Sequence, residues 1–144
     1  MTGVQTCALP IFDIVVLDAP CTATGTIRRH PDILRLRQPE DIVRMVKIQR
    51  ALLANASQLV RPGGMLIYST CSLEPEESER QVEALLAGTS DFARVVIHAS
   101  ELGADPSWIS PAGDLRTLPC HLPLEPDQMS GLDGFYVARL ERRA

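Results

Sequence analysis

The feature that most constrains the fold is a strand–helix–strand pattern in the first half of the chain. Residues 12–17 (FDIVVL) form a short apolar run rich in β-branched residues, which is typical of a buried parallel strand. Pro39 opens a helical pattern of apolar residues that reaches residue 60, and Pro62-Gly63-Gly64 is expected to stop it. Residues 65–68 (MLIY) form a second apolar run. Two strands joined by one helix predict a unit of an open α/β sheet.

The second half of the chain predicts fewer regular elements. Residues 74–87 have a second helical pattern, and residues 93–97 read as a third strand. Residues 99–132 are rich in Pro, Gly and Asp, which predicts a long loop with little regular structure. Residues 134–140 (GFYVARL) form a final strand. The order of these elements is that of the back half of an open α/β sheet.

Each of the first two strands is followed by polar residues and a cysteine. Asp18-Ala19-Pro20-Cys21 follows the first strand, and Ser69-Thr70-Cys71-Ser72 follows the second. Ligands of open α/β sheets bind outside the carboxyl ends of the strands, so both cysteines are expected at one site. Either cysteine alone is most simply a small buried core residue. The two cysteines together, with their charged and hydroxyl neighbours, indicate a catalytic site instead of two core positions.

At these residues the chain resembles the RsmB/Sun family of RNA cytosine-5 methyltransferases, and the resemblance covers roughly residues 12–143. The stretches that carry it are Asp18–Gly25 (DAPCTATG), Ile27–Asp32 (IRRHPD), Ser69–Glu77 (STCSLEPEE), Asp133–Tyr136 (DGFY) and Ala138–Leu140 (ARL). The resemblance implies the C-terminal portion of a Rossmann-like α/β methyltransferase fold, with a mostly parallel sheet and an antiparallel final strand. It also implies S-adenosylmethionine as cofactor and small-subunit ribosomal RNA as substrate.

The resemblance assigns roles to three residues. Cys71 is implied as the nucleophile that attacks carbon 6 of cytosine, Cys21 as a residue of product release, and Asp18 as a carboxylate on the cofactor side. A cysteine suits covalent catalysis because its thiolate is strongly nucleophilic near neutral pH. The residues alone leave the choice of nucleophile open. DNA cytosine-5 methyltransferases use a Pro-Cys nucleophile, which would point to Cys21.

Charge is distributed unevenly along the chain. Residues 12–61 carry a net charge of +3 and residues 62–144 a net charge of −7, which together give −4. A basic first half fits a polyanionic partner such as RNA. Arg28, Arg29 and His30 are the candidates for phosphate contacts. An exposed basic turn without a ligand would give the same pattern.

Cysteine spacing and hydropathy exclude several classes of protein. The chain has four cysteines and no CxxC pair, which argues against a zinc site and against a disulfide framework. No apolar run approaches the ~20 residues of a membrane helix. We therefore expect no metal, no membrane association, a cytoplasmic location and a monomeric parent protein.

The N-terminal region carries two further expectations. Residues 1–11 (MTGVQTCALPI) show no periodicity and resemble the translation of a sequencing adapter, so they are predicted to be non-native, and residues 12–144 to be the C-terminal part of a catalytic domain. The family's glycine-rich cofactor loop is expected upstream of residue 12. Gly63-Gly64 follows a helix and precedes a strand, which is the wrong order for such a loop. The isolated chain is therefore expected to be inactive.

Three alternatives compete with an RNA cytosine-5 methyltransferase. A non-catalytic remnant would at most bind RNA. An amino-group methyltransferase would carry Asn/Asp-Pro-Pro-Tyr at the first strand end and would need neither Cys21 nor Cys71. A cysteine hydrolase would need a histidine near one of the cysteines at a strand end, and the sequence places none there.

Overall fold

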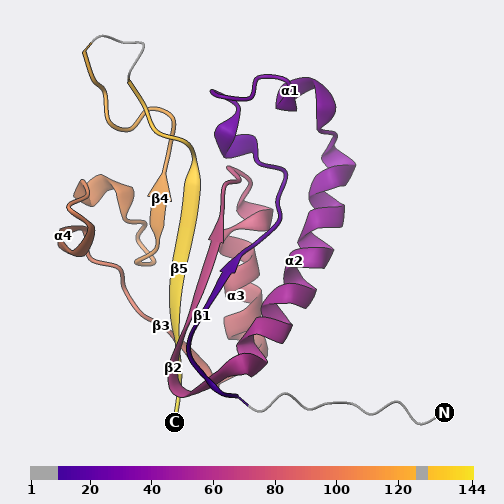
Figure 1. Cartoon of the computed structure of the whole chain (residues 1–144), viewed down its shortest axis with the longest axis vertical. Helices are drawn as coiled ribbons and strands as arrows, with labels where there is room; N and C mark the ends of the chain where they lie inside the picture. Colours follow the sequence, from indigo (N-terminus) through magenta and orange to yellow (C-terminus); the bar gives the residue numbers. More distant parts are fainter. Residues whose placement is uncertain (1–9, 126–129) are drawn as a thin grey trace.

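A computed structural model describes residues 10–125 and 130–144, which form a mixed sheet of five strands (Figure 1). The strands are β1 (Phe12–Asp18), β2 (Val60–Thr70), β3 (Phe92–Arg94), β4 (Leu115–Thr117) and β5 (Phe135–Arg142). Their order is β1-β2-β5-β3, and β4 also pairs with β5. β1 and β2 are parallel, whereas β5 is antiparallel to β2, β3 and β4. Among the described strands only β5 is reversed, which confirms the predicted sheet type.

The helices are α1 (Ile33–Leu36), α2 (Pro39–Leu59), α3 (Glu79–Gly88) and α4 (Ala99–Leu102), with short 3-10 turns at Thr24–Thr26, Pro75–Glu77 and Pro106–Trp108. The two predicted helices correspond to α2 and α3, although α3 begins later than predicted, after the 3-10 turn Pro75–Glu77. The short helices α1 and α4 were not predicted. α2 begins at Pro39 because Gln38 and Asp41 form a capping box, in which the Gln38 amide donates to Asp41 Oδ2 at 2.9 Å. In the described part of the chain, no helix has both the length and the hydropathy needed to cross a membrane.

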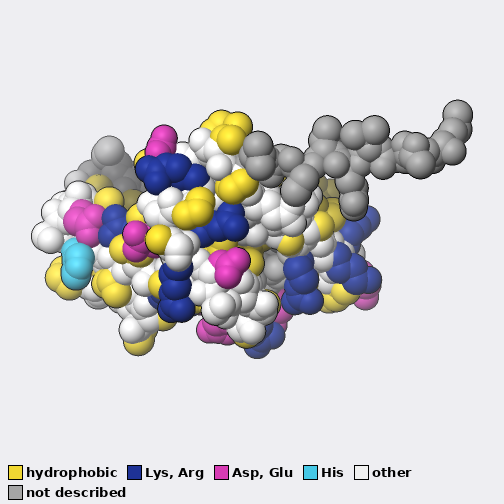
Figure 2. Space-filling view, turned by 90° about the horizontal axis from the view of Figure 1, so that it is seen from below, with side chains coloured by type: hydrophobic (Ala, Val, Ile, Leu, Met, Phe, Trp, Pro, Cys, Tyr) yellow, Lys and Arg dark blue, Asp and Glu magenta, His cyan; other side chains and the backbone are white. Residues whose placement is uncertain are grey.

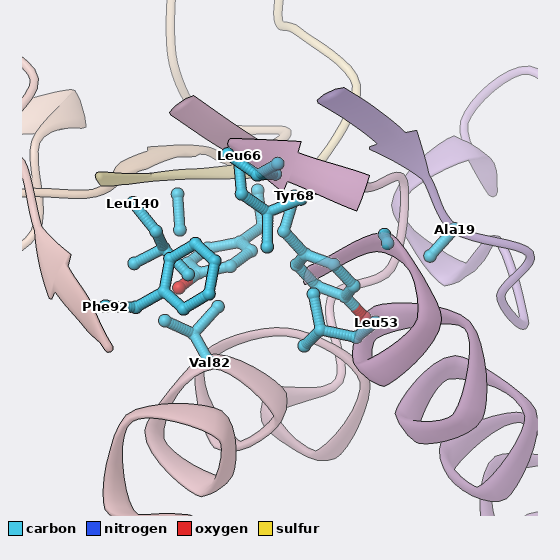
Figure 3. Packing of buried hydrophobic residues seen from close by; sticks show 11 residues of the cluster. Ala19, Leu53, Leu66, Tyr68, Val82, Phe92 and Leu140 are labelled. Atoms are coloured by element: carbon cyan, nitrogen blue, oxygen red, sulfur yellow. The ribbon is translucent and has the colours of Figure 1, made fainter. Parts of the chain in front are cut away.

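The hydrophobic core lies between one face of the sheet and the helices α2 and α3 (Figure 3). Leu53 of α2 and Val82 of α3 point toward Leu66 and Tyr68 of β2 and Leu140 of β5, and all five side chains are buried. Full burial of an aliphatic side chain stabilises a fold by about 1.5–3 kcal/mol. Two adjacent strands and both helices are thus fixed relative to one another by the same cluster.

The prediction that residues 12–17 form a buried strand is wrong in one respect. β1 is parallel to β2, but Ile14 and Val16 are 60% and 64% exposed. β1 is the edge of the described sheet, and α2 covers only the face that carries Val15 and Leu17. An apolar run predicts a strand correctly, but it does not say whether both of its faces are covered.

Pro62-Gly63-Gly64 does not stop the helix. α2 ends at Leu59, Val60 is already extended, and Pro62, Gly63 and Gly64 lie inside β2. The pairing of β1 with β2 shifts there, from Phe12↔Val60 to Ile14↔Met65, so the proline and glycines bulge out of the ladder. Gly63 has a φ of +73°, which a glycine adopts without strain.

Residues 99–132 contain more regular structure than predicted. The described part of this segment holds α4, a 3-10 turn and the strand β4, which pairs with β5. A strand of three residues is too short to show a period of two in sequence, so composition alone suggested a loop. β3 is also shorter than predicted, although Val95 still donates to the Arg139 carbonyl at 2.8 Å.

Candidate active site

The carboxyl ends of β1 and β2 bring the two predicted cysteines together. Asp18 pairs with Ser69 at the end of the parallel ladder, and the Ala19 amide still donates to the Ser69 carbonyl at 2.9 Å. Just beyond this point the Sγ atoms of Cys21 and Cys71 are 3.4 Å apart. Both cysteines are half-buried. Two loops that are fifty residues apart in sequence thus present a pair of thiols at one edge of the sheet (Figure 1).

The two thiols differ in their affinity for a proton. A hydrogen bond from Cys21 lowers the pKa of Cys71 to about 7, although burial and the nearby carboxylates of Asp18 and Glu77 act in the opposite direction. The same hydrogen bond raises the pKa of Cys21, and burial raises it further. Of the two thiols, Cys71 is therefore the one that loses its proton more readily, and it is roughly half ionised at neutral pH. The thiolate is the nucleophilic form.

The carboxylate of Glu77 links the two cysteine loops, whereas sequence reasoning had placed Glu77 in the STCSLEPEE stretch and at a helix start without giving it a role in the site. Glu77 is fully buried. It accepts hydrogen bonds from the Thr22 amide at 3.0 Å, the Thr22 hydroxyl at 2.5 Å, the Ser72 hydroxyl at 2.6 Å and the Gln49 amide at 3.1 Å. Thr22 directly follows Cys21, and Ser72 directly follows Cys71. One carboxylate therefore holds both loops in register through charge-assisted hydrogen bonds.

Three of the sequence motifs meet at Gly25. The Gly25 amide donates to the Cys71 carbonyl at 2.9 Å, and the Gly134 amide donates to the Gly25 carbonyl at 2.8 Å. A Cβ at position 25 would lie 2.0 Å from the Gly134 carbonyl oxygen and 2.7 Å from that of Cys71. Only glycine allows the backbones to approach this closely. The DAPCTATG, STCS and DGFY stretches are thus parts of one packed unit.

Arg116 of β4 also stabilises the loop that carries Cys71, and sequence reasoning did not identify this residue. Its guanidinium donates to the Ser72 carbonyl at 2.8 Å and to Glu79 Oε2 at 2.7 Å. It also lies over the ring of Tyr136, 5.1 Å from the centroid. The residue stands in the segment predicted to be a loop, so no pattern singled it out.

The remaining predicted site residues lie around this centre. Asp18 is exposed at the end of β1 and accepts a hydrogen bond from the Ser69 hydroxyl at 3.2 Å. Arg29 forms a salt bridge with Asp133 at 2.5 Å, and Arg28 donates to the Ser130 carbonyl at 2.7 Å. Both arginines therefore bind the segment that precedes β5, and both side chains are also exposed to solvent. His30 is exposed.

Across residues 10–125 and 130–144, no three His, Cys, Asp or Glu side chains are grouped so as to hold a metal ion. Residues 1–9, including Cys7 and most of the segment predicted to be non-native, lie outside the described residues.

The parallel strands, the reversed last strand and the polar loops at the carboxyl edge define a Rossmann-like α/β methyltransferase fold. The family model of the 16S rRNA methyltransferase RsmB/F matches residues 2–141, and the chain belongs to this family.

Individual relatives agree with this assignment. The chain is 43% identical over 132 residues to the ribosomal RNA small subunit methyltransferase B of Vibrio cholerae, and the match covers 92% of this chain and 26% of the relative. It is similar to the crystal structure of PH0851, with a TM-score of 0.74, 36% identity and coverage of 93% of this chain and 27% of that one. NSun6 from Pyrococcus horikoshii with SFG gives a TM-score of 0.63, 27% identity and coverage of 90% and 29%. The chain thus spans about a quarter of these relatives' length.

Proposed function

We propose that this chain is the catalytic-cysteine portion of a cytoplasmic S-adenosylmethionine-dependent methyltransferase that modifies carbon 5 of a cytosine in small-subunit ribosomal RNA. The observation that carries the proposal is the 3.4 Å contact between Cys21 and Cys71 at the carboxyl edge of the sheet. A single thiol would fit a core position, but two opposed thiols with different proton affinities fit a covalent mechanism. The names of the relatives, ribosomal RNA small subunit methyltransferase B among them, support the substrate.

Carbon 5 of cytosine is too weakly nucleophilic to accept a methyl group without activation. In the proposed mechanism the Cys71 thiolate adds to carbon 6, and the electron pair of the 5,6 double bond becomes available at carbon 5. S-adenosylmethionine supplies the methyl group from a sulfonium centre. Loss of the carbon 5 proton and departure of Cys71 from carbon 6 then restore the double bond. The addition consumes a Cys71 thiolate and the departure releases one, so the lowered pKa of Cys71 favours both of these steps.

Cys21 fits the release step. Its thiol retains its proton and points that proton at Cys71 Sγ, as the direction of the two pKa shifts requires. When Cys71 leaves carbon 6 as a thiolate, this hydrogen bond stabilises the leaving group. Without Cys21 the departing thiolate would lose its donor, and the enzyme–RNA bond would persist.

Asp18 is proposed as the residue of this chain that faces the cofactor. Its carboxylate is exposed at the carboxyl edge of β1, next to the cysteine pair. An exposed carboxylate at this place suits a ligand that carries positive charge, as S-adenosylmethionine does at its sulfonium and its amino group. The same carboxylate is close enough to the thiols to influence the pKa of Cys71, so it also lies within reach of the cytosine ring.

The RNA backbone is proposed to lie along the basic residues that follow the first cysteine. Arg28, Arg29 and His30 are exposed, as are Arg35 and Arg37 at α1. Figure 2 shows the molecule from below, the end opposite α1 of Figure 1, and Lys and Arg side chains lie on that face as well. Phosphate contacts from such residues fix position rather than sequence, so this surface would orient the RNA while the cysteine loops act on one base.

Two cysteine variants in a full-length protein that carries this chain test the proposal. Cys71→Ala should abolish methylation of small-subunit RNA. Cys21→Ala should retain attack and leave a covalent protein–RNA adduct on a denaturing gel. Adduct accumulation in the Cys71 variant instead would reverse the two roles, and full activity of both variants would reject covalent catalysis by either cysteine.

A second proposal concerns the 144-residue chain by itself, which we infer to be inactive. The observation behind it is that no G-x-G-x-x-G stretch occurs in the sequence, so the close backbone approach that such a glycine-rich loop allows to a nucleoside cofactor is not supplied by these residues. Titration calorimetry of the chain with S-adenosylmethionine should show no binding at micromolar concentrations. Micromolar affinity would contradict the inference.

A further inference from the structure

We propose that Cys21 and Cys71 form an oxidative modification site, in which a hydroperoxide such as hydrogen peroxide converts the two thiols reversibly into a disulfide. This inference needs only the opposed thiols and does not rest on RNA binding or methyl transfer. It goes beyond the proposed function because it gives the pair a second chemistry, with a peroxide as the co-substrate.

The distance between the sulfurs is the first argument. The Sγ atoms are 3.4 Å apart, and a disulfide bond is about 2.05 Å long, so closure requires a movement of about 1.4 Å. Both cysteines stand in loops just beyond strand ends, where rotation of the side chains can supply such a movement. No change in strand pairing is needed.

The packing around the loops is the second argument. Thr22 and Ser72, the residues that follow the two cysteines, bind the same buried carboxylate of Glu77. The Cys71 carbonyl is fixed by the Gly25 amide at 2.9 Å. These contacts keep the sulfurs opposed, which raises the rate at which one sulfur meets the other. Both cysteines are half-buried, so a small oxidant has access to them.

The location of the proton sets the order of the steps. Cys71, as the thiolate, attacks one oxygen of the peroxide, the O–O bond breaks, and a sulfenic acid and a hydroxide ion form; the hydroxide takes a proton from the solvent and becomes the first water. The sulfur of Cys21 then attacks the Cys71 sulfur and displaces hydroxide, which takes up the Cys21 proton and leaves as a second water. Two thiols lose two electrons and the peroxide gains them. A dithiol reductant reverses the reaction.

Formation of the disulfide would inactivate Cys71 as a nucleophile and would protect its sulfur from further oxidation. The disulfide removes the thiolate of Cys71, and therefore any nucleophilic activity of that residue. It also intercepts the sulfenic acid before further peroxide converts it to a sulfinic acid, a step that thiols do not reverse.

The test uses the 144-residue chain with Cys7→Ser and with the exposed Cys120 retained as an internal control. The chain is exposed to hydrogen peroxide near pH 7, quenched with N-ethylmaleimide, digested and analysed by mass spectrometry. The peptide linking Cys21 to Cys71 should form at least roughly tenfold faster than Cys120 is oxidised, because the pKa of Cys71 is lowered to about 7 and its sulfur faces that of Cys21 at 3.4 Å. Dithiothreitol should restore both thiols.

Variants and denaturant separate this inference from trivial oxidation. Cys21→Ser should leave a sulfenic acid at Cys71 that dimedone traps, whereas in Cys71→Ser the remaining Cys21 should react more slowly than Cys71 does in Cys21→Ser, because burial still raises the pKa of Cys21. In concentrated urea the preference for the Cys21–Cys71 link should disappear. Equal rates with and without urea, or conversion of Cys71 to a sulfinic acid with no disulfide, would overturn the inference. The proposed methyl transfer would be unaffected by either result, since no RNA or cofactor takes part.

Discussion

The loops after β1 and β2 both present a cysteine at the carboxyl edge of the sheet, but their surroundings differ. In the second loop, Ser69, Thr70 and Ser72 are buried around Cys71. In the first loop Ala19 and Thr22 are also buried, but Asp18 and Pro20 are exposed. One loop is embedded and the other borders solvent, yet the hydrogen bond between them directs the proton to Cys21 and leaves the thiolate on Cys71. In this pair the hydrogen-bond partner of each cysteine, more than the burial of its loop, determines which thiol ionises first.

The largest expected effect comes from removing the carboxylate that joins the two loops. Glu77→Ala should lower the free energy of unfolding by about 3–5 kcal/mol, because the buried donors of Thr22, Ser72 and Gln49 lose their acceptor. Urea denaturation of the 144-residue chain measures this loss. Glu76→Ala is the matched control, since its partly exposed ion pair with Arg80 should contribute at most about 1 kcal/mol. Similar losses in both variants would mean that Glu77 does not join the loops.

A smaller loss of stability is expected where the two loops meet the last strand. Gly25→Ala should cost about 1–3 kcal/mol, because its Cβ would overlap the carbonyl oxygens of Cys71 and Gly134. Gly88→Ala is the control: no atom lies within 4 Å of a Cβ at the end of α3, so that change should be neutral or stabilising. Differential scanning calorimetry of both variants provides the comparison. A Gly25 variant as stable as the Gly88 variant would show that the backbones are not in close contact.

The smallest change tests the hydrogen bond itself. Cys21→Ala removes the donor that lowers the pKa of Cys71, so this pKa should rise from about 7 toward the ordinary value near 9. The thiolate fraction at pH 7, and with it the rate of alkylation of Cys71 by iodoacetamide, should then fall by roughly tenfold. Rates at pH 10 should be similar in the two proteins, because Cys71 is then mostly ionised in both. An unchanged rate at pH 7 would assign the low pKa to another cause.

The sequence predicted those parts of the fold that depend on local patterns. The apolar runs located β1 and β2, Pro39 marked the start of α2, and the polar residues after each strand placed Cys21 and Cys71 at one edge. The family resemblance correctly gave the reversed final strand. These predictions succeeded because strand ends and helix starts are encoded by a few adjacent residues.

Other features depend on contacts between distant residues, and the sequence did not reveal them. Glu77 stands among charged residues that suit a helix start, and only the folded chain shows that it is buried beneath Thr22. Arg116 lies in a strand of three residues, too short for a pattern, yet it binds the Ser72 carbonyl. The exposure of Ile14 and Val16 follows from the place of β1 at the edge of the described sheet, which no property of the strand itself encodes.

The most direct test of the account is the pH dependence of alkylation at the cysteines of the unmodified chain, followed for each residue by mass spectrometry. We predict that Cys71 reacts with a midpoint near pH 7 and that Cys21 stays protected until far more alkaline pH, because its proton is held against Cys71. The exposed Cys120 provides an ordinary thiol for reference. If Cys21 reacted first, or if both followed the profile of Cys120, the assignment of Cys71 as the nucleophile would be contradicted.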